Sequence, residues 1–226
     1  MEFYHFVIQN KEIFKCFYAL TIILINVLIV LKADKLYSLS FHNGLRYFRN
    51  AFFFFGLAFA SRYFLKFIFD FVALYHLRFV SVYFFEFFLV VGGFFLLYSL
   101  LWRRFESPKP FSSLFSPIIA LFYVLALVIA LIDFLWRFHY LLFISQIILF
   151  LYAVIISHSN YRRNRKTHKF PKFYFLAMIL ALAAWILNFL AAVVFSWNMV
   201  FVVNIYILNS LFFLLFLYGL IKVVRG

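Results

Sequence analysis

Seven runs of predominantly apolar residues follow one another along this chain of 226 residues, at 13–31, 47–67, 79–101, 115–135, 138–157, 173–195 and 198–224. An α-helix needs about 20 apolar residues to cross the hydrocarbon core of a bilayer, and each run meets that requirement. Only 12% of the residues are charged, whereas a soluble domain carries roughly 25%. The sequence therefore predicts an all-α fold: a polytopic integral membrane protein with a single seven-helix transmembrane domain over residues 1–226.

The first two runs differ from the other five. The first is also compatible with a signal peptide, but the segment Leu31-Lys32-Ala33-Asp34-Lys35 that follows it shows no small-residue cleavage pattern, so we interpret it as a span. The second run lies within GLRYFRNAFFFFGLAFASRYFLKFIFD (residues 44–70) and contains Arg62. It is the one run that places an arginine among apolar residues at depth.

The basic residues predict the orientation. Alternate loops of a seven-span chain lie on opposite sides, and fifteen of the 21 Lys and Arg residues fall on one side: Lys32, Lys35, Arg46, Arg49, Arg103, Arg104, Lys109, Arg162, Arg163, Arg165, Lys166, Lys169, Lys172, Lys222 and Arg225. The other six are Lys11, Lys15, Arg62, Lys66, Arg78 and Arg137. The positive-inside rule then predicts a multi-pass protein of the cell membrane with its N-terminus outside and its C-terminus in the cytoplasm.

The net charge of +14 does not indicate nucleic-acid binding, because the charges occupy short loops that leave no room for a recognition fold. The densest run is HSNYRRNRKTHKFPK, at residues 158–172. We expect this cytoplasmic loop to contact anionic lipid head groups of the bilayer or, alternatively, a cytoplasmic protein partner. Its candidate residues are Arg162, Arg163, Arg165, Lys166, Lys169 and Lys172.

Two charged residues lie at similar depth in neighbouring spans. At 1.5 Å per residue, Arg62 is ~8 Å below the outer end of the second span and Glu86 is ~10 Å below that of the third. An isolated charge at depth costs a few kcal/mol. Arg62 can offset this cost by reaching up to the interface, by pairing with Glu86, or by contacting an anionic ligand. Glu86 is alternatively neutral, since burial disfavours a charged carboxylate.

Three amides lie at the same depth in later spans. Gln146, Asn188 and Asn204 are each ~9–12 Å below the outer surface. Together with Arg62 and Glu86 they form a polar layer, which either ties the helices together at about 0.6 kcal/mol per hydrogen bond or lines an outward-facing pocket for a small polar or anionic ligand. Other polar residues lie just above it (Asp133, Arg137 and His139) or deeper, as helix–helix contacts (Asn26 and Asn209).

Small residues predict where helices approach one another. At 100° per residue, the second span gathers Asn50, Ala51, Ala58, Ser61 and Arg62 within an arc of about 120°, which we expect to face other helices. The bulky residues Phe52, Phe59, Tyr63 and Phe64 lie outside this arc. In the third span, Gly92-Gly93 is typical of close helix packing.

No catalytic constellation is present. The chain has no HExxH, no glycine-rich phosphate loop, no GxSxG and no paired carboxylates, and His158 and His168 are isolated from other metal-ligand residues. We therefore expect no catalytic residues, no cofactor and no metal. No span contains an internal proline, so the broken helices common in transporters are not predicted.

The seven spans with short loops, N-terminus outside, resemble the architecture of microbial opsins and other seven-helix receptors, over the whole chain and without a shared motif. Opsins hold retinal on a lysine in the middle of the last helix, whereas Lys222 lies at the end of that helix here, so no retinal linkage is expected. The Pro-Gln pair of PQ-loop transporters is absent. We expect a non-enzymatic sensor or receptor; the alternatives are a small-solute transporter or channel, and a membrane scaffold subunit.

Overall fold

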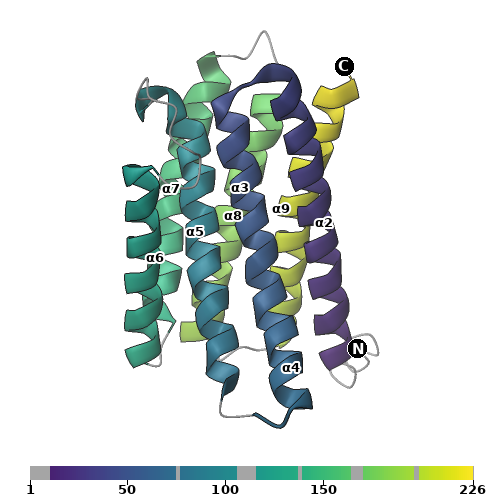
Figure 1. The fold of residues 1–226 in the computed structure, drawn as a ribbon, viewed down its shortest axis with the longest axis vertical. Helices are drawn as coiled ribbons and strands as arrows, with labels where there is room; N and C mark the ends of the chain where they lie inside the picture. Colours follow the sequence, from purple (N-terminus) through teal and green to yellow (C-terminus); the bar gives the residue numbers. More distant parts are fainter. Residues whose placement is uncertain are drawn as a thin grey trace.

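A computed structural model describes residues 11–74, 77–105, 116–136, 139–163, 170–195 and 199–225 of the protein. Within these residues the fold is all-helical, and seven helices are long and apolar enough to cross a membrane, which confirms the predicted number (Figure 1). The elements are α2 (Lys11–Ser40), α3 (Asn43–Ala60), η1 (Ser61–Leu65), α4 (Lys66–Phe71), α5 (Arg78–Phe105), α6 (Pro117–Trp136), α7 (Tyr140–Arg163), α8 (Phe170–Val193) and α9 (Met199–Arg225).

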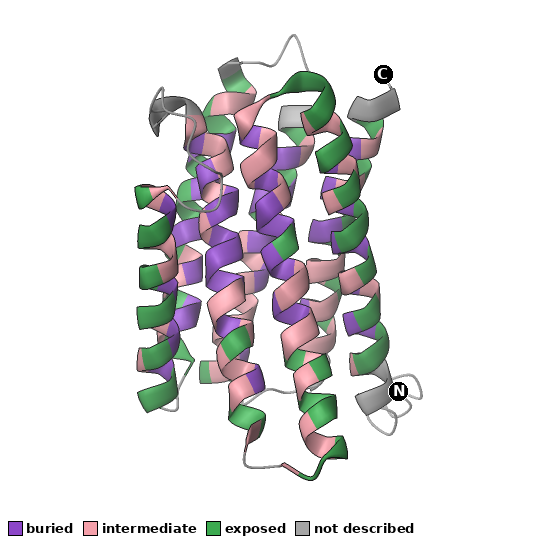
Figure 2. Cartoon of the chain, in the orientation of Figure 1, coloured by how far each residue is buried: buried purple, intermediate pink, exposed green. Residues whose placement is uncertain are grey.

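Six of the spans form a closed ring. The main contacts run from α2 to α3, from α3 to α5, from α5 to α7, and then through α8 and α9 back to α2. Helix α6 lies outside this ring and contacts α5 and α7. Figure 2 shows the buried residues gathered on the inward faces of the helices and the exposed ones on the outer faces and at the two ends. The outer faces are apolar, as lipid requires, so burial here follows packing rather than polarity.

The two ends of the bundle differ in charge. Helix α9 finishes at the end where α3 and α8 begin, and this basic end carries Arg46, Arg49, Lys172 and Lys222 among others (Figure 1). Helix α4 and the start of α2 lie at the opposite end. An ion pair joins Arg49 to Asp34 across α2 and α3 at the basic end, and Arg78 pairs with Asp70 between α5 and α4 at the opposite end.

The first helix is longer than predicted. We expected a loop at residues 32–46, but α2 continues to Ser40 and only two residues separate it from α3. Phe41 turns the chain with a φ of 49°. The segment after Leu31 contains Lys32, Ala33 and Lys35, which are good helix formers, so the helix continues although the segment is polar. Hydropathy locates the apolar part of such a helix and not its polar extension.

The packing of α3 only partly follows the predicted arc. Ala51 and Ala58 are fully buried, as expected, but Phe52 and Phe59, which we placed outside the arc, are also buried. The reason is that α3 packs on both α2 and α5, so most of its circumference is covered. Phe53, at 50% exposure, lies on its outer face.

The glycine pair of α5 fits close helix packing, as the sequence indicates. A Cβ on Gly92 would stand 2.8 Å from the Phe55 ring and 3.1 Å from the Ala51 carbonyl oxygen. A Cβ on Gly93 would stand 2.9 Å from the Gln146 side-chain oxygen. The two glycines therefore let α3 and α7 approach two different flanks of α5.

The second span is interrupted by a π-helical segment. Between α3 and α4, the five residues of η1 (SRYFL) widen the helix, and this is where Arg62 lies. A π-segment adds one residue to a turn, so every later residue is rotated by about 100° relative to a regular α-helix. Such segments often accompany functional sites.

Candidate functional site

A cavity of about 490 Å³ lies inside the six-helix ring, and each of the six spans contributes to it. We call it the central cavity. It begins near Lys15 and Arg62 at the end opposite the basic end and reaches Phe150 and Phe213. Phe150 is ten residues into α7, which places it ~15 Å along the helix, near the middle of the bundle. The polar residues lie mostly toward the mouth of the cavity, and the deepest lining is aromatic.

Arg62 occupies the mouth of the central cavity. Its guanidinium carbon lies 4.5 Å from the centroid of the Phe85 ring, in cation–π geometry. Among the described residues no carboxylate is within ion-pair distance of Arg62. The side chain is exposed and borders the cavity. Of the three roles predicted for Arg62, the ion pair with Glu86 is therefore not formed.

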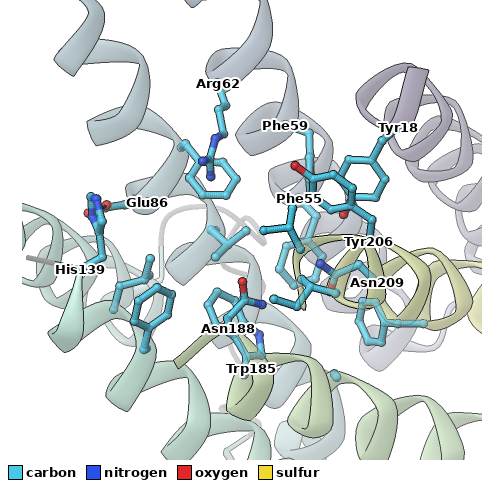
Figure 3. Close-up of a pocket in the computed structure, with 18 of the residues that line it drawn as sticks. Tyr18, Phe55, Phe59, Arg62, Glu86, His139, Trp185, Asn188, Tyr206 and Asn209 are labelled. Atoms are coloured by element: carbon cyan, nitrogen blue, oxygen red, sulfur yellow. Dashed lines mark ion pairs between the residues drawn. The ribbon is translucent and has the colours of Figure 1, made fainter. Parts of the chain in front are cut away.

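Glu86 pairs instead with the imidazole of His139, just before the start of α7 (Figure 3). The carboxylate is buried, whereas the side chain of His139 is 47% exposed. His139 lies in the connection between two spans. The hydrogen bond that the His139 imidazole donates to the Glu86 carboxylate raises the pKa of His139, with the charges of Glu86 and Asp133 adding to the effect, while burial and Arg62 oppose it. The protonated imidazole of His139 is thus favoured beside Glu86.

The Glu86–His139 pair also borders a second cavity of about 590 Å³, between α5 and the end of α6. We call it the side pocket. Its other lining residues include Phe79 and Tyr83 of α5 and Phe134 of α6. Since Glu86 and His139 line both cavities, the ion pair stands at the boundary between them.

Asp133 also lines the side pocket and accepts hydrogen bonds from the backbone at the start of α7. It is almost fully buried, at 1% exposure. Its two carboxylate oxygens accept hydrogen bonds from the backbone N–H groups of Leu141 (3.0 Å) and Leu142 (2.6 Å). These belong to the first turn of α7, whose N–H groups have no partner within the helix. Asp133 of α6 therefore caps α7, and the helix dipole favours its negative charge.

The flank of the central cavity opposite the ion pair is built from tyrosines (Figure 3). The ring of Tyr18 stacks on Tyr206 with centroids 4.2 Å apart and meets Phe59 edge-on at 5.9 Å. Tyr18 is 8% exposed, and its hydroxyl has no hydrogen-bond partner among the described residues. The Asn209 amide interacts with this hydroxyl without completing a hydrogen bond of good geometry.

Five aromatic residues lie between the central cavity and the basic end. Phe216 is at their centre, with ring centroids 5.3 Å from Phe48, 5.0 Å from Phe52 and 5.0 Å from Tyr174. Phe212 lies one turn nearer the cavity and borders it. All five are buried. We call Phe48, Phe52, Tyr174, Phe212 and Phe216 the aromatic plug.

The structure brings together three of the five residues of the predicted polar layer: Arg62, Glu86 and Asn188 all line the central cavity. Asn188 donates from its side-chain amide to the Ala184 carbonyl, 2.9 Å away in its own helix. Gln146 is fully buried beside Gly93 and is not part of the lining. Neither amide atom of Gln146 has a hydrogen-bond partner in the described chain. Asn204 lies on the exposed face of α9.

The two deeper asparagines also have different positions. Asn209 lines the cavity. Asn26, buried at the contact of α2 with Gly56 of α3, donates to the Ile22 carbonyl at 2.8 Å. This bond stays within α2, so Asn26 fills the contact without bridging the two helices through that bond.

The basic loop is only partly described. Arg162 and Lys172 are exposed at the ends of α7 and α8, and the backbone of Arg163 belongs to α7. Arg165, Lys166 and Lys169 lie outside the described residues. The lipid and partner contacts of this loop stay predictions.

Several lining residues were not singled out from the sequence, namely Lys15, Tyr18, Tyr63, Trp185 and Tyr206. Aromatic residues are common on every face of these helices, so their type alone carries no signal. The depth of Trp185, in contrast to Trp102 and Trp136 near helix ends, was a usable signal. No cluster of three or more metal-ligating residues occurs in the parts of the chain that are described.

Comparison of the chain with known protein families, with functionally described proteins and with solved structures finds no significant match to any of them.

Proposed function

We propose that this protein is a non-enzymatic membrane protein of the sensor or receptor type, which binds a small ligand in the central cavity. The observation that carries the proposal is a cavity of about 490 Å³ enclosed by six helices. Pockets for small molecules have volumes of 300–1,000 Å³, with apolar walls and a few convergent polar groups. The lining of Phe, Tyr and Trp with Arg62, Glu86, His139 and Asn188 has this composition.

The orientation follows from charge. With the basic end in the cytoplasm, as the positive-inside rule predicts, the mouth at Arg62 opens to the outside of a cell membrane. Ligand binding would then be reported across the bilayer by the ring helices. The basic residues at their inner ends, Arg162 and Lys172 among them, would meet anionic lipid or a cytoplasmic partner.

A small-solute transporter is the second candidate, because the cavity reaches the middle of the bundle. A transporter must also open a path to the basic end, and there the buried aromatic plug fills the ring. Proteoliposomes distinguish the two functions. For a sensor we expect no flux of a bound solute above that of protein-free vesicles, whereas saturable uptake would establish transport.

Trp185 provides a direct binding assay. A variant with Trp102→Phe, Trp136→Phe and Trp197→Phe keeps Trp185 as the only tryptophan, inside the cavity. Aryl bromides quench tryptophan on contact, and three of matched shape carry different charges: para-bromophenylacetate, the corresponding phenethyl alcohol and the phenethylamine. We expect saturable quenching by at least one probe. Absence of saturable quenching by all three would overturn ligand binding in this cavity.

Two controls separate the cavity from the lipid phase. A variant that retains only Trp136, which is 66% exposed on α6, reports non-specific partitioning and should show no saturation. Ala181→Phe adds a ring to the cavity lining, where Ala181 is 4% exposed, and should abolish saturable quenching of Trp185.

A further inference from the structure

The Arg62 guanidinium is not balanced by a carboxylate of the cavity. Among the described residues no carboxylate lies within ion-pair distance of Arg62. Glu86 is the carboxylate of the cavity lining, and it is engaged with His139. The charge of Arg62 at the mouth of the cavity can therefore attract an anion.

Arg62 is held in a position to bind an anion. It lies in the π-segment at the mouth, and the face of Phe85 is 4.5 Å from its guanidinium carbon. Stacking on a ring leaves the edge of the guanidinium, with its N–H donors, free of that contact. A planar guanidinium presents paired donors that match the oxygens of a carboxylate, sulfonate or phosphate.

A second donor points to the same ligand chemistry. The Tyr18 hydroxyl is buried in the cavity wall and lacks a hydrogen-bond partner among the described residues. Leaving a buried hydroxyl unsatisfied is unfavourable, and an oxygen acceptor of a ligand would remove the cost. Tyr18 and Arg62 line the same cavity. Both groups can therefore act on one bound molecule.

The rest of the lining is suited to an apolar body. Phe59 packs edge-on against Phe85 with centroids 5.9 Å apart, and Trp185 with Phe143 forms the facing side. Aromatic faces and edges favour ligand rings in stacked or edge-to-face geometry. The wall thus continues from the arginine at the mouth to rings in the interior.

We propose that the central cavity is selective for a compact amphipathic anion, in which a carboxylate, sulfonate or phosphate on an aromatic or other apolar body meets Arg62 and Tyr18. This inference rests on the proposed function and adds the chemical class of its ligand. Such an anion can come from solution or from a lipid with an anionic head group.

The three aryl bromides test the class in nanodiscs of neutral lipid. We expect para-bromophenylacetate to quench Trp185 with a Kd about 10- to 100-fold lower than that of the alcohol, as a hydrogen bond to a charged group implies, and the amine to bind more weakly than the alcohol. Arg62→Gln should remove the preference for the acid, and Arg62→Lys should retain part of it. Tyr18→Phe should weaken binding of the acid more than that of the alcohol.

Lys66→Gln is the matched control. Lys66 is exposed, lies one turn after Arg62 and is not part of the cavity lining, so its loss should leave the preference unchanged. Equal binding of acid and alcohol by the wild-type protein, or a preference that survives Arg62→Gln, would overturn the anion selectivity while ligand binding stands. Absence of binding by all three probes would overturn the proposed function as well.

Nanodiscs that contain anionic lipid identify the source of the anion. If anionic lipid displaces para-bromophenylacetate from Trp185, the head group of a lipid occupies the site. If it does not, the site takes a soluble anion. Either result agrees with the proposed ligand class, whereas displacement of the acid by neutral lipid alone would contradict it.

Discussion

The carboxylate of Glu86, buried in the outer part of the third span, pairs with the imidazole of His139 at the entrance to the fifth, and so joins α5 to the connection between α6 and α7. The imidazole of His139, and not Arg62, is therefore the partner of the buried Glu86 carboxylate. The pair also stands at the boundary between the central cavity and the side pocket, because both residues line both cavities.

This pair predicts a pH dependence of stability. The pKa of His139 is raised above its ordinary value of 6.5, so the stabilisation is complete below pH 6.5 and is lost as the pH rises through the raised value. We expect the melting temperature of the purified protein to fall over this range and to fall less in His139→Gln. Because the His139 side chain is half-exposed, solvent screens the ion pair, and its contribution to stability is at most about 1 kcal/mol.

The control for this prediction is His158→Gln. His158 is exposed on α7, and its loss should leave the pH profile unchanged. Glu86→Gln and His139→Gln should not have additive effects, since each removes the same interaction. If the melting temperature of His139→Gln changed with pH in the same way as that of the wild type, the Glu86–His139 pair would not be the cause of the pH dependence.

Asp133 predicts a local effect on α7. Asp133→Ala removes the acceptor of two backbone N–H groups, at Leu141 and Leu142, and we expect a loss of about 1–2 kcal/mol. Hydrogen exchange should accelerate at the amides of these two residues. Ser116→Ala is the comparison, because the Ser116 hydroxyl accepts one long bond of 3.4 Å from Ile119 at the start of α6; its effect should be smaller. Unchanged exchange at Leu141 and Leu142 would contradict the cap.

Two adjacent phenylalanines on α3 test the packing of the aromatic plug. Phe52 is fully buried and Phe53 is 50% exposed. Truncation of a buried phenylalanine leaves a void and costs about 3–5 kcal/mol, so Phe52→Ala should lower the free energy of unfolding in mixed micelles far more than Phe53→Ala. Equal losses for both variants would mean that α3 is turned differently in its membrane.

The glycines of α3 and α5 give opposite predictions. Gly92→Ala forces a Cβ against the Phe55 ring and the Ala51 carbonyl, and we expect a loss of about 1–3 kcal/mol. In Gly56→Ala the new Cβ would meet Asn26 at 3.4 Å, an ordinary contact, and alanine is the better helix former. That variant should unfold at the same denaturant concentration as the wild type or a higher one. The opposite order would show that α3 and α5 are further apart.

The seven helices could be predicted because the length and apolarity of a span are properties of a single segment. The face that each helix turns toward the interior could not. Phe59 and Tyr63 lie outside the predicted arc of small and polar residues, yet both line the cavity, because α3 is covered by α2 on one side and by α5 on the other. The arc shows where small residues gather along a helix, and it does not show how many neighbours surround that helix.

For the predicted polar layer, the sequence indicates the depth of each residue but not its partners. Depth along the spans predicts one level for five residues, of which Arg62, Glu86 and Asn188 line the central cavity in the structure. Depth does not determine partners, however. Glu86 pairs with His139 because the short connection after α6 carries the imidazole over α5, and this depends on where α6 lies relative to the ring.

That placement of α6 has a mechanical consequence. The six-helix ring is closed without it, so α6 can shift without opening the walls of the central cavity. Yet its last turn holds the N-terminus of α7 through Asp133, and the next described residue, His139, holds Glu86. A sideways movement of α6 would therefore displace two parts of the cavity rim at once, namely the start of α7 and the Glu86–His139 pair.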